Sequence, residues 1–289
     1  MTAFIQQIVG GLLMGGIYAL AAFGLSIVFG VLNVLNIAHG EFLMLGALGA
    51  YLIYIATGLN PFVIIILIIP LFALFSWVFQ RLLIRPIKGK TETEILIASI
   101  LVTLGASLLI EDITFFFWPK SFTSIPYSLP TLHLGEVMIP ILRLCGLAVI
   151  VVLTVVMGLF LRHSYMGRAI RAVAQNVDGA RVVGVPTQKI AAMTFVIGTS
   201  LAAVAGVFYV TLYSMTPYMG LPLTVKYMVI VIMGGLGGLT GPLAAGLILG
   251  ITETFVGYYL GSVWAPSVAY IAFIIILLVR PQGLFGVKE

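Results

Sequence analysis

The sequence predicts an all-α fold, a polytopic transmembrane helical bundle of about 8–9 spans that includes broken or re-entrant helices. Only 8% of its 289 residues are charged, whereas 62% are hydrophobic. A soluble domain usually carries about 25% charged residues, so this surface must be covered largely by lipid. The charges are also bunched, and the apolar stretches between them approach the ~20 residues that cross ~30 Å of hydrocarbon. We expect a single membrane domain over residues 1–289.

Nine apolar windows have the length and composition of spans, at residues 7–31, 40–57, 61–82, 94–117, 141–161, 190–212, 224–238, 242–260 and 267–280. The first boundary is weak, because residues 30–40 are apolar but broken. The window 224–238 is short, so we expect a re-entrant or kinked helix there. Small residues recur at a spacing of four in Gly11–Gly15, Ala202–Gly206, Gly234–Gly238 and Gly246–Gly250. In lipid, such pairs let helix backbones approach closely.

Basic residues set the expected orientation. Eleven of the fourteen Lys and Arg fall in the loop 81–94, in the segment 162–189 and near the C-terminal end. Cytoplasmic loops are enriched in Lys and Arg, so these three segments should face the cytoplasm and the N-terminus should lie outside. Lys120, Arg143 and Lys226 are then assigned to the other side. The net charge of +5 therefore indicates membrane topology rather than a nucleic-acid partner.

A polar interruption separates the first two windows. Asn33, Asn36, His39 and Glu41 lie within nine residues and would be costly in lipid. Irregular backbone at membrane depth must be buried in protein or line a cavity. One interpretation is that these side chains cap broken backbone. The other is that they form the gate or lining of a substrate pathway. One His and one Glu do not make a metal site, so no metal is expected.

A second unusual segment is rich in glycine, at Gly234, Gly235, Gly237, Gly238 and Gly241. It lacks the Gly-Lys-Ser/Thr of a phosphate-binding loop. Glycine lets the backbone turn sharply and lie against its neighbours, so we expect a tight turn or helix break.

The cytoplasmic segment 162–189 contains an amphipathic pattern. Arg168, Arg171, Gln175 and Asp178 recur at spacings of three and four, and an apolar stripe of Ile170, Val173, Ala174 and Val177 lies opposite. This predicts one helix that ends near Gly184. Such a helix is either an interfacial linker or a docking element for a partner.

Little else in the chain indicates chemistry. Glu253 lies in mid-span and is a candidate proton relay or structural hydrogen-bonding group. No Ser-His-Asp, His-Glu-x-x-His or paired-cysteine arrangement is present, so we expect no enzyme.

Residues 32–42 resemble the signature of LivH-type permeases, the membrane subunits of branched-chain amino acid ABC importers. The match continues at 166–172, 194–198, 234–238 and 280–286, in the expected order. The resemblance implies a second, LivM-like permease, two cytoplasmic ATPase subunits that bind ATP and Mg, and a periplasmic or surface substrate-binding protein. No cofactor is then expected in this chain, which lies in the cell (inner) membrane in contact with lipid. The family's coupling helix corresponds to residues 162–189, which assigns contact with the ATPases to Arg168, Arg171, Gln175, Asp178, Arg181 and Gly184.

Two alternatives remain from the sequence. One is a passive channel or permease for urea or short amides, which needs no cytoplasmic docking helix. The other is an ion-coupled carrier, which should place ion ligands near the midplane. Only Glu253 and Glu41 are candidates for that role.

Overall fold

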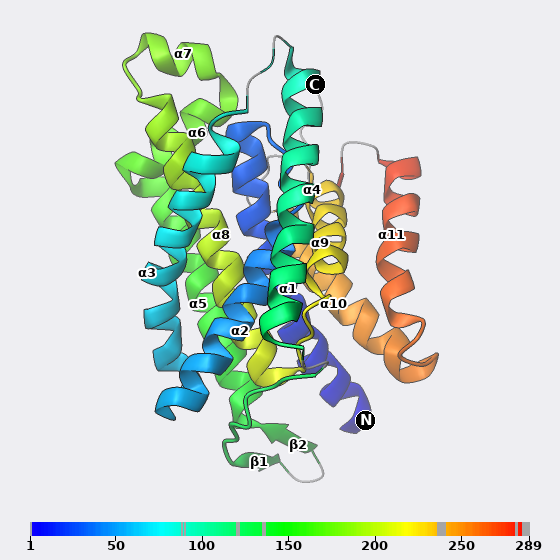
Figure 1. The fold of residues 1–289 in the computed structure, drawn as a ribbon. Helices are drawn as coiled ribbons and strands as arrows, with labels where there is room; N and C mark the ends of the chain where they lie inside the picture. The colour runs from blue at the N-terminus through cyan, green and yellow to red at the C-terminus, as the bar shows by residue number, and fades with distance from the viewer. Residues whose placement is uncertain are drawn as a thin grey trace.

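The computed structural model describes residues 2–87, 89, 91–119, 122–134, 137–235, 241–280 and 283–284. Within them the chain forms a bundle of long helices with one small hairpin (Figure 1). The elements are α1 (Thr2–Leu32), α2 (His39–Thr57), α3 (Pro61–Phe79), the π-helical turn η1 (Gln80–Ile84), α4 (Glu92–Phe117), β1 (Thr131–Leu134), β2 (Val137–Pro140), α5 (Ile141–His163), α6 (Tyr165–Gln175), α7 (Val177–Val182), α8 (Thr187–Leu212), α9 (Gly220–Gly234), α10 (Gly241–Tyr259) and α11 (Ala265–Val279).

Each of the nine predicted windows corresponds to a helix, so the all-α membrane fold is confirmed. Seven helices in the described part of the chain are long and apolar enough to cross a membrane. The two shorter apolar helices are α9 and α11, of 15 residues each. At 1.5 Å per residue each spans about 22 Å, less than the ~30 Å of a hydrocarbon core. The short 224–238 window therefore correctly indicated a helix that differs from a full-length span.

The α1 helix is the centre of the bundle, and small residues allow its neighbours to approach. On the face toward α10, a Cβ placed on Gly15 would lie 2.8 Å from the Leu247 Cα. On the face toward α8, a Cβ placed on Gly24 or Gly198 would overlap the other residue's backbone. These contacts confirm the packing role predicted for the spaced small residues of α1 and α10.

The end of α9 and the start of α10 lie inside the length of α1. Gly246 contacts Ala19, and α10 begins five residues earlier at Gly241, beside Gly234 at the end of α9. Five residues of helix rise about 7.5 Å, whereas the thirteen residues of α1 beyond Ala19 rise about 20 Å. The facing ends of α9 and α10 therefore lie within the bundle.

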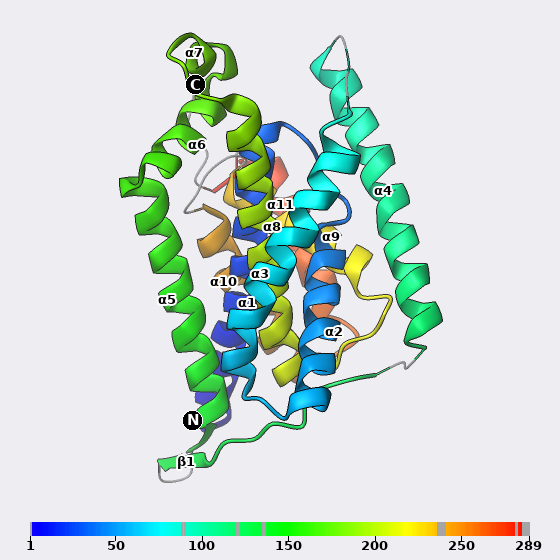
Figure 2. The ribbon, with the colours of Figure 1, turned by 60° about the vertical axis from the view of Figure 1, so that its left-hand side comes forward.

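The remaining helices are more peripheral. Figure 2 shows α4 standing apart from α2 and α3, on the opposite side of the bundle from α5. One end of the bundle carries η1, the start of α4, and α6 and α7, and the other carries the N-terminus and the β1–β2 hairpin (Figure 1). The basic residues of η1 and α6 thus share one end, as the orientation prediction requires.

Candidate functional site

The polar break between α1 and α2 folds back into the bundle instead of forming a loop at its end. Asn33 has a φ of 50°, the only positive value for a non-glycine among the described residues. Asparagine adopts this left-handed conformation more readily than most residues. The chain then returns until His39 Nε2 lies 3.0 Å from the Ala21 carbonyl oxygen. Ala21 lies eleven residues before the end of α1, or about 16 Å along its axis. The break is therefore re-entrant.

A ladder of hydroxyl groups on α4 holds this segment. Three fully buried residues one helical turn apart make the bonds: Ser99 Oγ accepts from the Leu35 amide (3.2 Å), Thr103 Oγ1 accepts from the Ile37 amide (3.0 Å), and Ser107 Oγ donates to Glu41 Oε1 (2.9 Å). Backbone amides in apolar surroundings need partners, and these hydroxyls supply them. The spacing of four between polar residues in an apolar helix was the sequence signal for this ladder, and the sequence reasoning missed it.

The structure separates the four residues predicted for the gate. Asn33 is exposed, whereas Asn36, His39 and Glu41 are all 0% exposed. Asn36 Oδ1 accepts a hydrogen bond from the Ala38 amide at 3.1 Å. This bond caps the broken backbone locally.

These three buried side chains are only partly satisfied. Asn36 Nδ2, His39 Nδ1 and Glu41 Oε2 have no hydrogen-bond partner among the described residues. A buried polar atom without a partner costs about 1–3 kcal/mol, and such atoms in native structures need an explanation. Only Asn36 caps the broken backbone, whereas His39 bonds to the Ala21 carbonyl and Glu41 accepts from Ser107, so capping does not account for all three side chains.

The start of α9 meets the start of α2 at this point. Thr224 Oγ1 accepts from the Gly40 amide at 2.7 Å. Gly220 lies so close to Glu41 that a Cβ there would overlap the carboxylate. Two helix N-termini, each with its partial positive charge, thus converge on one carboxylate.

A buried ion pair lies next to this junction, and the sequence reasoning missed it. Lys226 Nζ donates to Glu253 Oε1 at 2.7 Å, and each side chain is only 11% exposed. Lys226 also donates to the Tyr18 hydroxyl at 3.1 Å. Lys226, which the charge pattern assigned to the outer side, is therefore buried within α9 rather than exposed in a loop. Two opposite charges in neighbouring apolar windows were the available signal.

Aromatic rings connect the ion pair to the re-entrant segment. The Tyr227 ring packs edge-on against both Tyr18 and His39, with centroids 6.2 Å and 6.3 Å apart. The Tyr227 hydroxyl is also buried without a partner among the described residues. The core of the bundle therefore contains one continuous polar cluster from Asn36 to Glu253.

The predicted single cytoplasmic helix is in fact two. α6 ends at Gln175, and Asn176 caps α7 by accepting from the Gly179 amide at 2.7 Å. Asparagine competes for backbone amides and so favours a cap over a helix interior. Asp178 consequently lies on a different helix from Arg171. The apolar face of α6 is buried through Ile170 and Val173 as predicted, but Ala174 is exposed.

The predicted coupling residues differ in their surroundings. Arg171 donates to the carbonyl oxygens of Leu161 and Arg162, so it fastens α6 to the end of α5. Asp178 and Arg181 form an exposed ion pair at 3.1 Å. The other predicted residues, Arg168, Gln175 and Gly184, are exposed, and Gly184 has a φ of 81°.

The glycine-rich segment is partly described. Gly234 and Gly241 lie in backbone contact, so neither has room for a Cβ, and Gly235 has a φ of 101°. α9 therefore ends at Gly234 and α10 begins at Gly241, so the described residues contain a helix break here. Gly237 and Gly238 lie outside the described residues.

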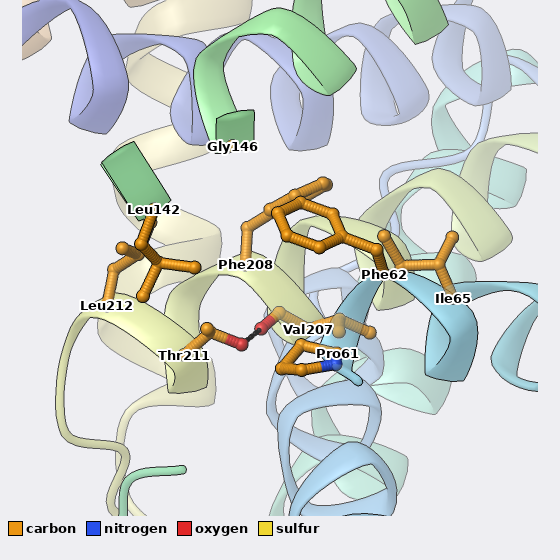
Figure 3. Close-up of a pocket in the computed structure, with 9 residues that line it drawn as sticks. All are labelled: Pro61, Phe62, Ile65, Leu142, Gly146, Val207, Phe208, Thr211 and Leu212. Carbon is orange, nitrogen blue, oxygen red and sulfur yellow. Dashed lines mark hydrogen bonds between the residues drawn. The ribbon is translucent and has the colours of Figure 1, made fainter. Parts of the chain in front are cut away.

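A small cavity between α3, α5 and α8 is too small for a substrate. Its volume is about 10 Å³, roughly enough for one water molecule. Figure 3 shows the residues around it, which are Pro61, Phe62, Ile65, Leu142, Gly146, Val207, Phe208, Thr211 and Leu212. Thr211 Oγ1 donates to the Val207 carbonyl, so the only hydroxyl in this lining is already bonded.

Several long apolar helices around a polar re-entrant core define a multi-pass membrane transport protein, and comparison with known proteins specifies its family. Residues 7–279 match the family described as the branched-chain amino acid transport system permease component. The chain belongs to this family. Its helical membrane fold, its family and its transport class are thus consistent with one another.

Individual relatives cover the whole chain. The LivH permease of the high-affinity branched-chain amino acid transport system of Escherichia coli strain K12 is 31% identical, over 99% of this chain and 96% of its own. The corresponding BraD permease of Pseudomonas aeruginosa is 31% identical, over 99% and 97%. Among solved structures, a chain of PsaBC from Streptococcus pneumoniae in complex with Fab has a TM-score of 0.51 at 15% identity, over 96% of this chain and 92% of that one. That likeness supports the fold alone.

Proposed function

We propose that this chain is a permease subunit of an ATP-driven importer for branched-chain amino acids. The observation that carries the proposal is its full-length similarity to the LivH and BraD permeases. A second, LivM-like permease completes the pathway, and a periplasmic or surface binding protein delivers the substrate. Two cytoplasmic ATPases bind ATP and Mg²⁺ and hydrolyse the ATP. The C-terminus and the basic end of the bundle face those ATPases.

The re-entrant segment forms the gate in this proposal. Asn36, His39 and Glu41 have unpartnered atoms, which are available to a substrate once the segment is uncovered. α4 is the element that uncovers it, because hydroxyl hydrogen bonds, rather than a broad apolar interface, join the two. Asn33 lies at the exposed end of the same segment. Half-helix ends and unwound backbone serve substrate binding in other transporters.

The α6–α7 pair forms the coupling element. The buried face of α6 and the bonds made by Arg171 fix the pair to α5, so a force on α7 is transmitted to a membrane helix. Val182, the last residue of α7, is 88% exposed, and Val183, which follows the helix, is 76% exposed. Exposed apolar residues beside the Asp178–Arg181 pair suit a protein partner with a mixed surface.

Reconstitution tests the function directly. Proteoliposomes with both permeases, both ATPases and the binding protein should import leucine, isoleucine and valine only when ATP is present. Urea and acetamide in the same assay should not accumulate. Uptake of urea without ATP would contradict the proposal and favour the passive channel.

The gate is tested by comparing two asparagines that both cap backbone. Asn60 Oδ1 accepts from the Phe62 amide at the start of α3, far from the re-entrant segment. Asn60→Ala should lower uptake only as far as it lowers the amount of folded complex. Asn36→Ala and His39→Ala should lower uptake about tenfold further. If all three variants fall on one line of uptake against folded complex, the polar residues only cap the backbone.

Coupling is tested at the exposed surface of α7. Val182→Asp should reduce ATPase stimulation by the loaded binding protein at least fivefold, because it places a charge in the proposed contact. The matched control is Val263→Asp at the opposite end, where the valine is 85% exposed. Equal stimulation in both variants would refute docking through α7.

A further inference from the structure

A cavity of about 590 Å³ opens at the end of the bundle that carries the N-terminus. It lies between the start of α1, the start of α5, the end of α8, the second half of α10 and the start of α11. Its volume falls within the ~300–1,000 Å³ of small-molecule sites. We call it the vestibule. By the orientation proposed above, the vestibule faces the outside.

Two opposite charges lie on the walls of the vestibule. Arg143, in the first turn of α5, forms no ion pair and no hydrogen bond with the described residues. Glu253 on α10 uses Oε1 for Lys226, while its Oε2 is buried in the wall and has no partner in the described part of the chain. The buried Glu253 oxygen is costly without a donor, whereas the Arg143 guanidinium is only partly buried and can be reached by a ligand in the cavity.

Tyr213 lies within electrostatic reach of both charges. Burial raises the pKa of the Tyr213 hydroxyl, the Arg143 guanidinium opposes this rise, and the Glu253 carboxylate adds to it. Val9 and Met14 add apolar surface to the same cavity. Methionine is flexible and adapts to differently shaped apolar groups.

We propose that the vestibule is a binding site for the free zwitterion of an apolar α-amino acid before it reaches the gate. The substrate carboxylate pairs with Arg143, whose planar guanidinium matches a carboxylate bidentately. The substrate ammonium pairs with Glu253 and the Tyr213 hydroxyl. The apolar side chain lies against Met14 and Val9. A ligand with only a negative or only a positive charge can pair with only one of the two charged residues, so the arrangement favours a zwitterion over a simple anion or amine.

The position of Glu253 explains how such a site connects to the gate. Glu253 is bonded to Lys226, which reaches Tyr18, and the rings of Tyr18 and Tyr227 lead to His39. An ammonium arriving at Glu253 competes with Lys226 for the same carboxylate. Binding in the vestibule therefore weakens a contact that holds α9 to α10.

The proposal rests on the proposed function, and its test measures binding as well as transport. The complex of both permeases and both ATPases, without the binding protein, is titrated with radiolabelled leucine. The competitors are isoamylamine, which lacks the carboxylate, and 4-methylpentanoate, which lacks the amine. In the wild-type complex both should compete at least tenfold more weakly than leucine, because each leaves one wall unpaired.

Arg143→Gln should weaken leucine binding about tenfold and leave isoamylamine binding unchanged, so that the two compounds bind with similar affinity. Arg143→Lys should restore part of the lost leucine affinity. Thr252→Val is the matched control, since Thr252 is exposed on α10 and its hydroxyl bonds to its own helix. Wild-type leucine affinity in Arg143→Gln, or an equal loss for all three compounds, would overturn the proposal.

A lipid phosphate also pairs with a guanidinium, so the titration is repeated in vesicles with and without phosphatidylglycerol. An effect of Arg143→Gln seen only with the anionic lipid would assign Arg143 to a headgroup and overturn the proposal. Failure of the wild-type complex to import any amino acid would overturn the proposed function itself. Normal import with wild-type affinity in Arg143→Gln would overturn the vestibule site alone.

Discussion

The ion pair between Lys226 and Glu253 provides the sharpest quantitative test of the structure. We consider three variants: Lys226→Met, Glu253→Gln and the double substitution. Methionine keeps the length and apolar stem of lysine, and glutamine keeps the shape of glutamate. The variants therefore remove charge with little change in volume.

The structure sets the magnitude. At 2.7 Å and an effective dielectric constant of about 20, the attraction between the two charges is about 6 kcal/mol before desolvation. Each side chain is 11% exposed, so most of that attraction offsets the cost of removing two charges from water. Removing one partner leaves the other charge buried, which typically costs about 3–5 kcal/mol. The double variant leaves no buried charge and should lose only about 1–2 kcal/mol.

The assay is equilibrium unfolding of the purified permease in mixed micelles, followed by tryptophan fluorescence. The free energy of unfolding of the four proteins defines a double-mutant cycle. The expected coupling energy between the two positions is at least 3 kcal/mol. The exposed pair of Asp178 and Arg181 is the control, with side chains 87% and 61% exposed. Its coupling energy should be below about 1 kcal/mol.

One result would refute this reasoning. If the losses in the two single variants add within about 0.5 kcal/mol to the loss in the double variant, the two side chains do not interact. The structure would then be wrong about how α9 sits against α10. A coupling as small as that of the exposed control pair would mean that water reaches the pair.

Three further predictions concern packing, orientation and the hydroxyl ladder. Gly198→Leu should abolish folded protein because it separates α8 from α1, whereas Gly105→Leu, with no atom within 4 Å of an added Cβ, should retain it; detergent-soluble yield on size exclusion distinguishes them. In a cysteine-free background, Val182→Cys should react with an impermeant maleimide only in inverted vesicles and Val263→Cys only in intact cells, and the reverse pattern would invert the topology. Ser107→Ala should destabilise the fold by about 1–3 kcal/mol, since it leaves the carboxylate of the re-entrant segment without its donor; thermal unfolding with unchanged midpoint would contradict this.

The spans were predictable because lipid imposes a simple rule on sequence. Every backbone group in a span must be satisfied internally, so each span is an uninterrupted apolar helix of nearly fixed length. The interruption from Asn33 to Glu41 and the short window 224–238 departed from that rule, and both depart from a simple span in the structure. The prediction of an amphipathic helix within residues 162–189 was also correct. Its division at Asn176 was missed, because the periodicity of three and four continues across a cap that only the asparagine reveals.

The contacts of the polar core were not predictable from local pattern. Lys226 and Glu253 are 27 residues apart, and the apolar pattern of each window does not show that their helices are neighbours. The hydroxyl ladder joins Ser107 to Glu41, which are 66 residues apart. Such pairs depend on which helices pack side by side. In a membrane protein nearly every helix face is apolar, so the sequence does not show which faces pack together. Two opposite charges in separate spans still indicated an ion pair, because an unpaired charge in lipid costs more free energy than a pair.

The helix break between α1 and α2 and the helix break between α9 and α10 depend on each other. One break lets α2 begin beside Ala21, and the other lets α10 begin five residues before its contact with Ala19. Each alone would leave helix ends without partners at membrane depth. Together they bring α9 against α2, so that Thr224 serves the Gly40 amide and Gly220 lies against Glu41. A substitution that straightens either break must therefore disturb the other, and this mutual dependence makes a pair of half-helices suited to switching between two arrangements.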